Sequence, residues 1–174
     1  MKTNTLLFGA LAGFAAVSTV ISGYAAAATD ARAEVIFSQP EKFTDVRDAY
    51  SASEKGQKAN LDLIRDYLVS RANRFVADGQ KLTITFTDID LAGDFEPWRG
   101  PEGMDIRVVK DIYPPRMDLE FKLTDASGAV IKEGKRQLRD LAFMSKLSIN
   151  TNDSLRFDKA LLDDWLSSEF GRRK

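Results

Sequence analysis

The fold is decided by the stretch LTITFT, residues 82–87. Apolar side chains alternate with threonines along it, which is the period of a β-strand with one buried and one exposed face. A strand of this kind packs against a core on one side and meets water on the other. The stretch therefore predicts an antiparallel or mixed sheet that is open to solvent on one side.

The alternation breaks directly after this strand, where the chain continues as TDIDLAGDFEPWRG, residues 87–100. Asp88 falls on the face of the core residues and Ile89 on the opposite face, so we expect a β-bulge or the end of the sheet here. Carboxylates, arginines, prolines and a Trp crowd the segment that follows, as far as Arg116. Long loops inside compact domains tend to carry function. We therefore take this segment as the candidate site.

A long amphipathic helix is predicted before the strand, because apolar residues recur there at steps of three and four. Ser51 and Glu54 have the spacing of a capping box, although Gly56 favours a later start. Gly79 is a natural stop. The apolar stripe consists of Leu61, Ile64, Leu68, Ala72 and Phe75.

A β-hairpin is predicted in the second half of the chain. Residues 117–123 and 129–138 alternate again, and they flank the turn-forming segment 124–128. Shorter strands are expected at residues 34–37 and 106–110. A short apolar helical turn follows the hairpin.

A final helix is predicted near the C-terminus, capped by Asp153 or Ser154 and ended by Gly171. The basic residues 172–174 suit its negative end. We therefore expect an α+β domain, in which an antiparallel or mixed sheet of four to five strands carries the long helix and the C-terminal helix on one face. The apolar face of the final helix consists of Phe157, Leu161, Leu162, Trp165, Leu166 and Phe170.

The first 28 residues have the layout of a secretory signal peptide, with a basic start, an apolar run and small residues for cleavage near Ala27 or Ala28. We therefore expect a signal peptide over residues 1–28, a single domain over residues 29–174 and a periplasmic location. The alternative is a retained membrane anchor, for which the apolar run is barely long enough. After cleavage we expect no membrane span.

The composition excludes several classes of site. The chain has no Cys and no His, so disulfides, thiolate metal sites, a Cys nucleophile and a Ser-His-Asp triad cannot form. A conventional zinc site would have to use carboxylates alone. The 25 basic and 26 acidic residues are interspersed, and no basic block indicates nucleic-acid binding. We expect no cofactor.

Five motifs are spread over the chain: FTDV (43–46), DIDLAGDFEPWRG (88–100), VVKDIYPPR (108–116), LRDL (138–141) and LLDDW (161–165). Together they resemble an uncharacterised family of exported proteins of Gram-negative bacteria, catalogued as a domain of unknown function. The resemblance covers nearly the whole chain after the leader. It implies export and a single domain, and it carries over no catalytic residue and no ligand.

We expect the 88–116 region to bind a protein partner or an envelope component without catalysis. Aromatic and arginine side chains are enriched at binding hot spots, and prolines lower the cost of ordering a loop. Phe95 and Trp98 could instead fold back as a lid on the core. The hypothesis requires the segment to be held against the sheet, and an indole dangling in solvent from a detached segment would contradict it. The residues proposed to bind are Asp88, Asp90, Asp94, Glu96, Trp98, Arg99, Arg107, Tyr113 and Arg116.

One alternative is a calcium-binding module. Asp88, Asp90, Asp94 and Glu96 occupy positions 1, 3, 7 and 9 of an EF-hand-like register. Position 12 should be a bidentate Glu but is Arg99, and a strand rather than a helix leads into the segment. The carboxylates could therefore pair with nearby arginines instead.

The other alternative is a carboxylate-based enzyme acting on glycans. Glu96 with Asp94 or Asp105 would supply the two carboxyl groups, and Trp98 would stack on a sugar. Such enzymes hold their carboxyl groups roughly 5–10 Å apart across a cleft. Spacing along a loop does not determine that separation.

Overall fold

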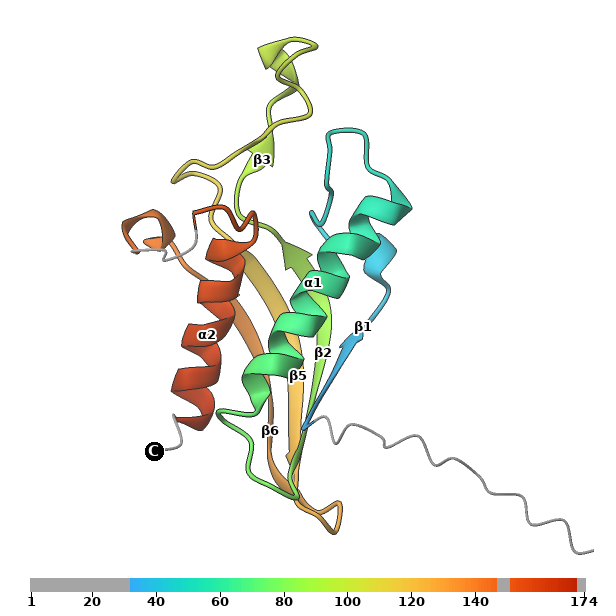
Figure 1. The fold of residues 1–174 in the computed structure, drawn as a ribbon, viewed down its shortest axis with the longest axis vertical. Coiled ribbons are helices and arrows are strands. Elements are labelled where there is room, and N and C mark those ends of the chain that lie inside the picture. Colours follow the sequence, from blue (N-terminus) through green and yellow to red (C-terminus); the bar gives the residue numbers. More distant parts are fainter. Residues whose placement is uncertain (1–31, 147–150, 172–174) are drawn as a thin grey trace, which may run out of the picture.

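The computed structural model describes residues 32–146 and 151–171 (Figure 1). The predicted signal peptide and the basic residues 172–174 lie outside this range. None of the helices within it is both long and apolar enough to cross a membrane. The elements are β1 (Ala33–Phe37), η1 (Pro40–Lys42), α1 (Glu54–Ala72), β2 (Lys81–Asp90), β3 (Asp94–Phe95), η2 (Pro97–Arg99), β4 (Arg107–Val108), β5 (Arg116–Thr124), β6 (Val130–Arg139), η3 (Phe143–Ser145) and α2 (Arg156–Phe170).

The main sheet has four strands in the order β1-β2-β5-β6. β1 runs parallel to β2, and α1 provides the crossover that a parallel pair needs. The pairs β2–β5 and β5–β6 are antiparallel. The predicted α+β domain with a mixed sheet is therefore confirmed. Residues 106–110, predicted as a short strand, contribute only β4, which pairs with β3 in a separate two-stranded ribbon.

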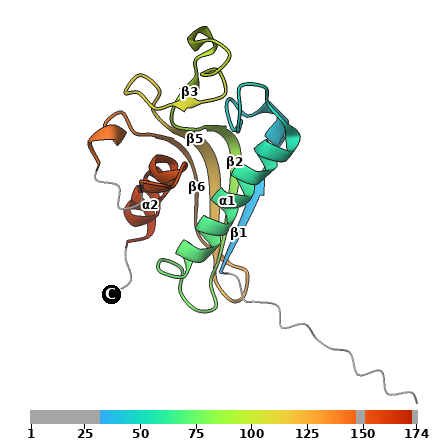
Figure 2. The ribbon, with the colours of Figure 1, turned by 45° about the horizontal axis from the view of Figure 1, so that its top comes forward.

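Both helices cover the same face of the main sheet, and the opposite face is open (Figures 1 and 2). On the covered face, Ile84 and Phe86 are completely buried and lie beside Phe121 and Leu119 of β5. Burial of apolar surface stabilises by roughly 25 cal/mol per Å², so this layer holds the sheet to the helices. The helices contribute Leu61, Ile64, Leu68, Leu161, Leu162, Trp165 and Leu166 to the same core.

The start of α1 corrects two details of the prediction. The cap is Ser53 rather than Ser51, because its hydroxyl accepts a hydrogen bond from the amide of Gly56 at 3.0 Å. Gly56 therefore lies in the first turn instead of delaying the helix. A Cβ at Gly56 would lie 1.8 Å from Cγ of Asp48, so glycine lets the preceding segment pack against the helix.

The predicted bulge is present in β2. The register between β2 and β5 shifts between Phe86 and Asp88. Because of this shift Ile89 returns to the core, where it is fully buried. Asp88 and Asp90 then lie in register with Asp118 and Arg116 of β5, residues that alternate with the buried face.

Residues 91–115 leave the sheet between β2 and β5 and extend beyond one end of the molecule (Figure 1). We call them the projecting loop, and residues 97–106 its tip. The chain turns at Gly93, which has φ +84° and donates its amide to the carbonyl of Tyr113 at 3.0 Å. A Cβ at Gly93 would lie 2.8 Å from the carbonyl oxygen of Val108. The outgoing and returning chains therefore meet at a distance that only glycine permits.

We expect Gly93→Ala to destabilise the domain by about 2–4 kcal/mol, which combines left-handed backbone strain with overpacking. Gly100→Ala is the matched control, because Gly100 has φ +82° but no atom within 4 Å of an added Cβ. It should cost only the backbone strain at φ +82° and ψ 175°, about 1–3 kcal/mol, and less than Gly93→Ala. Urea unfolding of both variants measures the difference. Equal costs would show that the close approach at Gly93 is unimportant.

Candidate functional site

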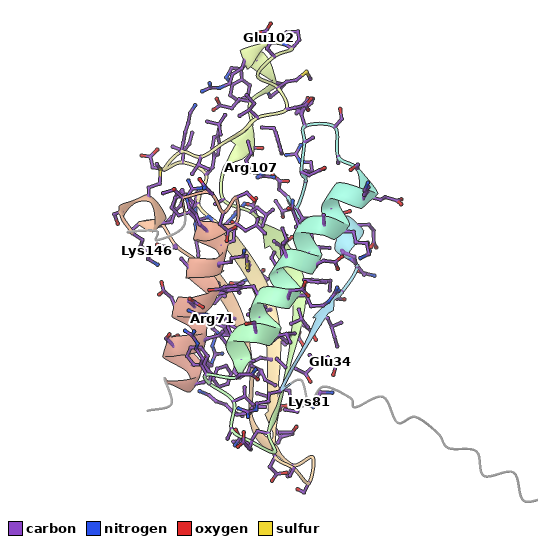
Figure 3. The ribbon with its side chains drawn as sticks, in the orientation of Figure 1. Glu34, Arg71, Lys81, Glu102, Arg107 and Lys146 are labelled. Carbon is purple, nitrogen blue, oxygen red and sulfur yellow. The ribbon has the colours of Figure 1, made fainter. Side chains whose placement is uncertain are left out.

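The predicted site residues lie in the projecting loop and at the end of the sheet beneath it. Figure 3 shows Arg107 at the base of the loop and Glu102 at its far end. Charged pairs tie the lower part together, whereas the tip extends away from the sheet. The positions are Asp88, Asp90 and Arg116 at the sheet end, Asp94 and Arg107 at the base, Glu96, Arg99 and Tyr113 around a second cluster, and Trp98 at the tip.

A buried carboxylate, Asp45, organises the base of the projecting loop. It is 5% exposed. Arg107 donates to both of its oxygens, each at 3.1 Å, and Arg47 donates to the same two oxygens at 3.0 and 3.2 Å. The amide of Asp45 donates to the carbonyl of Ile89 at 3.0 Å, and its carbonyl accepts from the amide of Leu91 at 2.9 Å. The carboxylate is therefore fixed to the end of β2.

The same two arginines hold the loop. Arg47 donates to Asp94 at 3.2 Å, and Arg107 donates to the carbonyl of Gly93 at 2.8 Å. Both guanidinium groups also lie over the ring of Phe95, at 5.2 and 4.6 Å from its centroid. Cation–π contacts of this kind add to the charge-assisted hydrogen bonds. Phe95 is buried as a result.

The protonation state of Asp45 reflects two opposed effects. Burial alone would raise its pKa, but the hydrogen bonds from Arg47 and then Arg107 outweigh burial and hold the pKa below 3.8. The group is therefore ionised near neutral pH. It contributes stability that is present above about pH 4 and is lost as the pH falls through its lowered pKa.

A second enclosed carboxylate, Glu96, closes the loop above the base. Its side chain is 1% exposed. Lys110 donates to one oxygen, Arg99 donates to the other at 2.6 Å, and the hydroxyl of Tyr113 donates at 3.3 Å. Hydrogen bonds from Lys110 and Arg99 lower the pKa of Glu96 from 4.5 to about 2. Glu96 is covered by these partners rather than by the core, because the loop stands away from the sheet.

At the sheet end, two carboxylates join β2 to its neighbours. Asp90 accepts from Nε of Arg116 at 2.9 Å, and also from a second nitrogen of the same guanidinium. Burial raises the pKa of Asp90, and Arg116 opposes that rise. Asp88 accepts from the amide and the hydroxyl of Thr44, both at 2.7 Å. The segment that carries Asp45 is thus tied to β2 at two neighbouring positions.

Asp158, in the first turn of α2, holds the loop from below. One of its oxygens accepts from the amide of Ala92 at 3.0 Å, and the other has no hydrogen-bond partner among the described residues. The side chain is 1% exposed. Burial raises the pKa of Asp158 from 3.8 to about 7.

The tip carries exposed apolar side chains. Trp98 is 72% exposed and Ile106 is 59% exposed. The alternative of a lid on the core is therefore wrong for Trp98, and Phe95 is buried beneath Arg47 and Arg107 rather than within either hydrophobic cluster. The requirement that the segment be held to the sheet is met at the base, but the indole does lie in solvent.

The structure does not bring the four predicted calcium ligands together. Asp88 bonds Thr44, and the other three carboxylates each bond an arginine or lysine. Within residues 32–146 and 151–171 no group of three or more acidic side chains is placed to hold a metal ion. For the glycan alternative, Glu96 with a pKa of about 2 is ionised near neutral pH and has no proton to donate as a general acid.

Four residues of the site were missed by sequence reasoning: Asp45, Arg47, Lys110 and Asp158. Asp45 and Asp158 are separated from the loop along the chain, and only the folded sheet and α2 bring them beneath it. Asp45 does lie in the FTDV motif and Lys110 in the VVKDIYPPR motif, and these motifs were the available signals.

The chain belongs to the family described as "Protein of unknown function (DUF3016)", whose family model matches residues 31–168. The matched region includes the whole projecting loop and most of α2. A search of curated proteins and a search of solved structures found no match to the chain.

Replacing Arg107 by Gln should destabilise the domain by about 3 kcal/mol, because the buried carboxylate of Asp45 loses one of its two cations. Lys81→Gln is the control, since Lys81 pairs with Glu34 at 2.6 Å and both side chains are about half exposed (Figure 3). That change should stay within about 0.5 kcal/mol. Denaturant unfolding measures both, and a cost below about 1 kcal/mol for Arg107→Gln would contradict the role of Asp45.

Asp158→Asn should raise the melting temperature by about 3–6 °C at pH 8 and change it little at about pH 4. The native state holds the Asp158 proton more tightly than the unfolded chain, because the pKa is raised from 3.8 to about 7. This contribution to stability is fully present below about pH 4 and is lost as the pH rises to about 7. Asp66→Asn, at an exposed helix position, should show no such pH difference. An equal effect of Asp158→Asn at both pH values would refute the assignment.

Proposed function

We propose that this protein is an exported, non-catalytic binding protein that recognises a protein partner or an envelope component through the projecting loop. The observation that carries the proposal is Trp98, exposed at the tip of a loop whose base is fixed by buried ion pairs. Tryptophan and arginine are enriched among the residues that dominate binding energy. A large apolar side chain held out in solvent exposes surface that a partner would bury.

The fixed base favours binding because it lowers the entropy lost on association. Asp45 and Glu96 each bind two cationic side chains, so the loop is tied at two levels below Trp98. Pro97 and Pro101 restrict the backbone on either side of the indole. A partner would therefore meet a surface that is largely ordered before contact.

The carboxylates of the loop support a non-catalytic role. Asp45 and Glu96 are ionised and saturated by cations, so neither is poised to exchange protons near neutral pH. Asp158 has a pKa in the working range of a general acid or base but is 1% exposed and holds the amide of Ala92. A buried group with that hydrogen bond serves to hold the loop.

Export rests on the layout of residues 1–28 and on the absence of cysteine, which lets the domain fold without regard to redox conditions. Fractionation of Gram-negative cells that express the full chain tests it. We expect the protein in the periplasmic fraction, with an N-terminus at residue 28 or 29 by sequencing. An uncleaved N-terminus in the cytoplasmic fraction would refute export.

The binding proposal is tested by placing a photoreactive phenylalanine analogue at position 98 and, as control, at position 63. Leu63 is also exposed, at 47%, but lies on α1 away from the loop. Crosslinking in envelope preparations should yield a discrete adduct from position 98 only. With that partner purified, Trp98→Ala should weaken binding by about 30-fold or more, as expected for a hot-spot residue. Leu63→Ala should leave it unchanged.

The proposal is overturned if Trp98→Ala and Leu63→Ala retain equal affinity for the captured partner, or if position 98 yields no adduct that position 63 lacks. Unfolding curves of the two alanine variants should match the wild type, because both side chains are exposed. This control separates loss of binding from loss of fold.

A further inference from the structure

A cavity of about 360 Å³ lies beside the projecting loop, at the end of the sheet. Asp90, Arg116 and Arg139 line it from the strands, and Ile112 and Tyr113 line it from the returning part of the loop. A neighbouring cavity of about 260 Å³ shares Thr44, Arg116 and Arg139 with it. Arg139 therefore lines both cavities. We call the larger one the sheet-end cavity.

Three aspartates and three arginines line the sheet-end cavity, and all of them except Arg139 are ion-paired with a described residue. The guanidinium of Arg139 has no hydrogen bond or ion pair with any residue that the structure describes. Every other charged side chain that lines the cavity already has a partner of opposite charge. These pairs are Asp45 with Arg47 and Arg107, Asp90 with Arg116, and Asp94 with Arg47.

The position of Arg139 in the sheet is also unfavourable, because it faces another arginine. Arg116 and Arg139 are direct cross-strand neighbours in the β5–β6 register. Like charges placed opposite one another destabilise a sheet. Asp90 neutralises the charge of Arg116, because Nε and Nη2 of Arg116 donate to its carboxylate. Nη1 of Arg116 makes no hydrogen bond with a described residue. Asp88 and Asp118 line the neighbouring cavity with Arg139, but their carboxylates bond Thr44 and Gln137. No hydrogen bond or ion pair among the described residues uses the Arg139 cation.

We propose that the sheet-end cavity binds the oxyanion group, a carboxylate or a phosphate, of a small ligand, and that Arg139 is its principal donor. The paired N–H groups of a guanidinium match the spacing of two oxygens in either a carboxylate or a phosphate. Arg116, the cross-strand neighbour of Arg139, offers Nη1 as a second donor. The cavity volume lies at the lower end of the range for small-molecule sites. Ile112, Pro114 and Leu91 line it with apolar surface that suits a small hydrocarbon body. This site is separate from Trp98 and does not depend on the partner proposed above.

Thermal melts of the full chain in inorganic phosphate, in succinate and in chloride of equal ionic strength test the proposal. At about ten times the dissociation constant, the bound oxyanion should raise the melting temperature of the wild type by about 3–6 °C over chloride. A rise in phosphate alone assigns a phosphate group, a rise in succinate alone assigns a carboxylate, and a rise in both supports the shared chemistry. If neither anion raises the melting temperature at concentrations up to about 50 mM, which is ten times a dissociation constant of about 5 mM, the proposal is overturned.

Three variants separate a specific site from general salt effects, since phosphate stabilises many proteins by exclusion from their surface. Arg139→Gln should lose the oxyanion-dependent rise, and Arg139→Lys should keep part of it. Arg74→Gln is the matched control, because Arg74 is an exposed arginine after α1 that lines neither cavity, and it should behave as the wild type. In chloride, Arg139→Gln should be at least as stable as the wild type, because it removes the like-charge contact. Equal rises in the wild type and Arg139→Gln, or a marked loss of stability of Arg139→Gln in chloride, would overturn the assignment.

Discussion

The buried carboxylate of Asp45 is the constraint on which the projecting loop depends. An ionised group that is removed from water requires cations and hydrogen-bond donors around it. The two arginines that satisfy it come from different parts of the chain. Arg47 follows the carboxylate directly, and Arg107 comes from β4, on the returning side of the loop. The hydrogen bonds and ion pairs of this one carboxylate therefore join the end of β2, the segment before α1 and the projecting loop.

The other charged contacts extend this arrangement in both directions. Below the base, Asp158 holds the amide of Ala92 and so fixes the loop to α2. Above it, Glu96 gathers Lys110 and Arg99 into a second cluster. These charged side chains pair with one another or with backbone amides, and these contacts hold the loop backbone in place. At its tip the loop presents the apolar side chains of Trp98 and Ile106 beside the exposed charged residues Arg99, Glu102 and Asp105. The exposed Trp98 above a base of paired charges is the basis of the proposed recognition role.

The sequence predicted the fold well where a local pattern determined it. The alternation over residues 82–87, the bulge after it and the apolar stripes of both helices follow from side-chain period, which packing enforces directly. The site was predicted less completely. The acidic and basic residues of the loop could be named, but their pairing could not, because Asp45 and Asp158 approach the loop only through tertiary structure. The exposure of Trp98 was also undetermined, since a Trp beside prolines suits a buried lid as well as a solvent-facing tip.

The central claim is that the Asp45 cluster keeps the projecting loop ordered, and backbone ¹⁵N relaxation of the wild type and Asp45→Asn tests it most directly. The account predicts order parameters of about 0.8 or higher for the loop from Gly93 to Lys110 in the wild type, typical of rigid backbone. In Asp45→Asn they should fall below about 0.6 in the loop, with the main sheet unchanged. Order parameters that are the same in both proteins, or already low in the wild-type loop, would contradict the account.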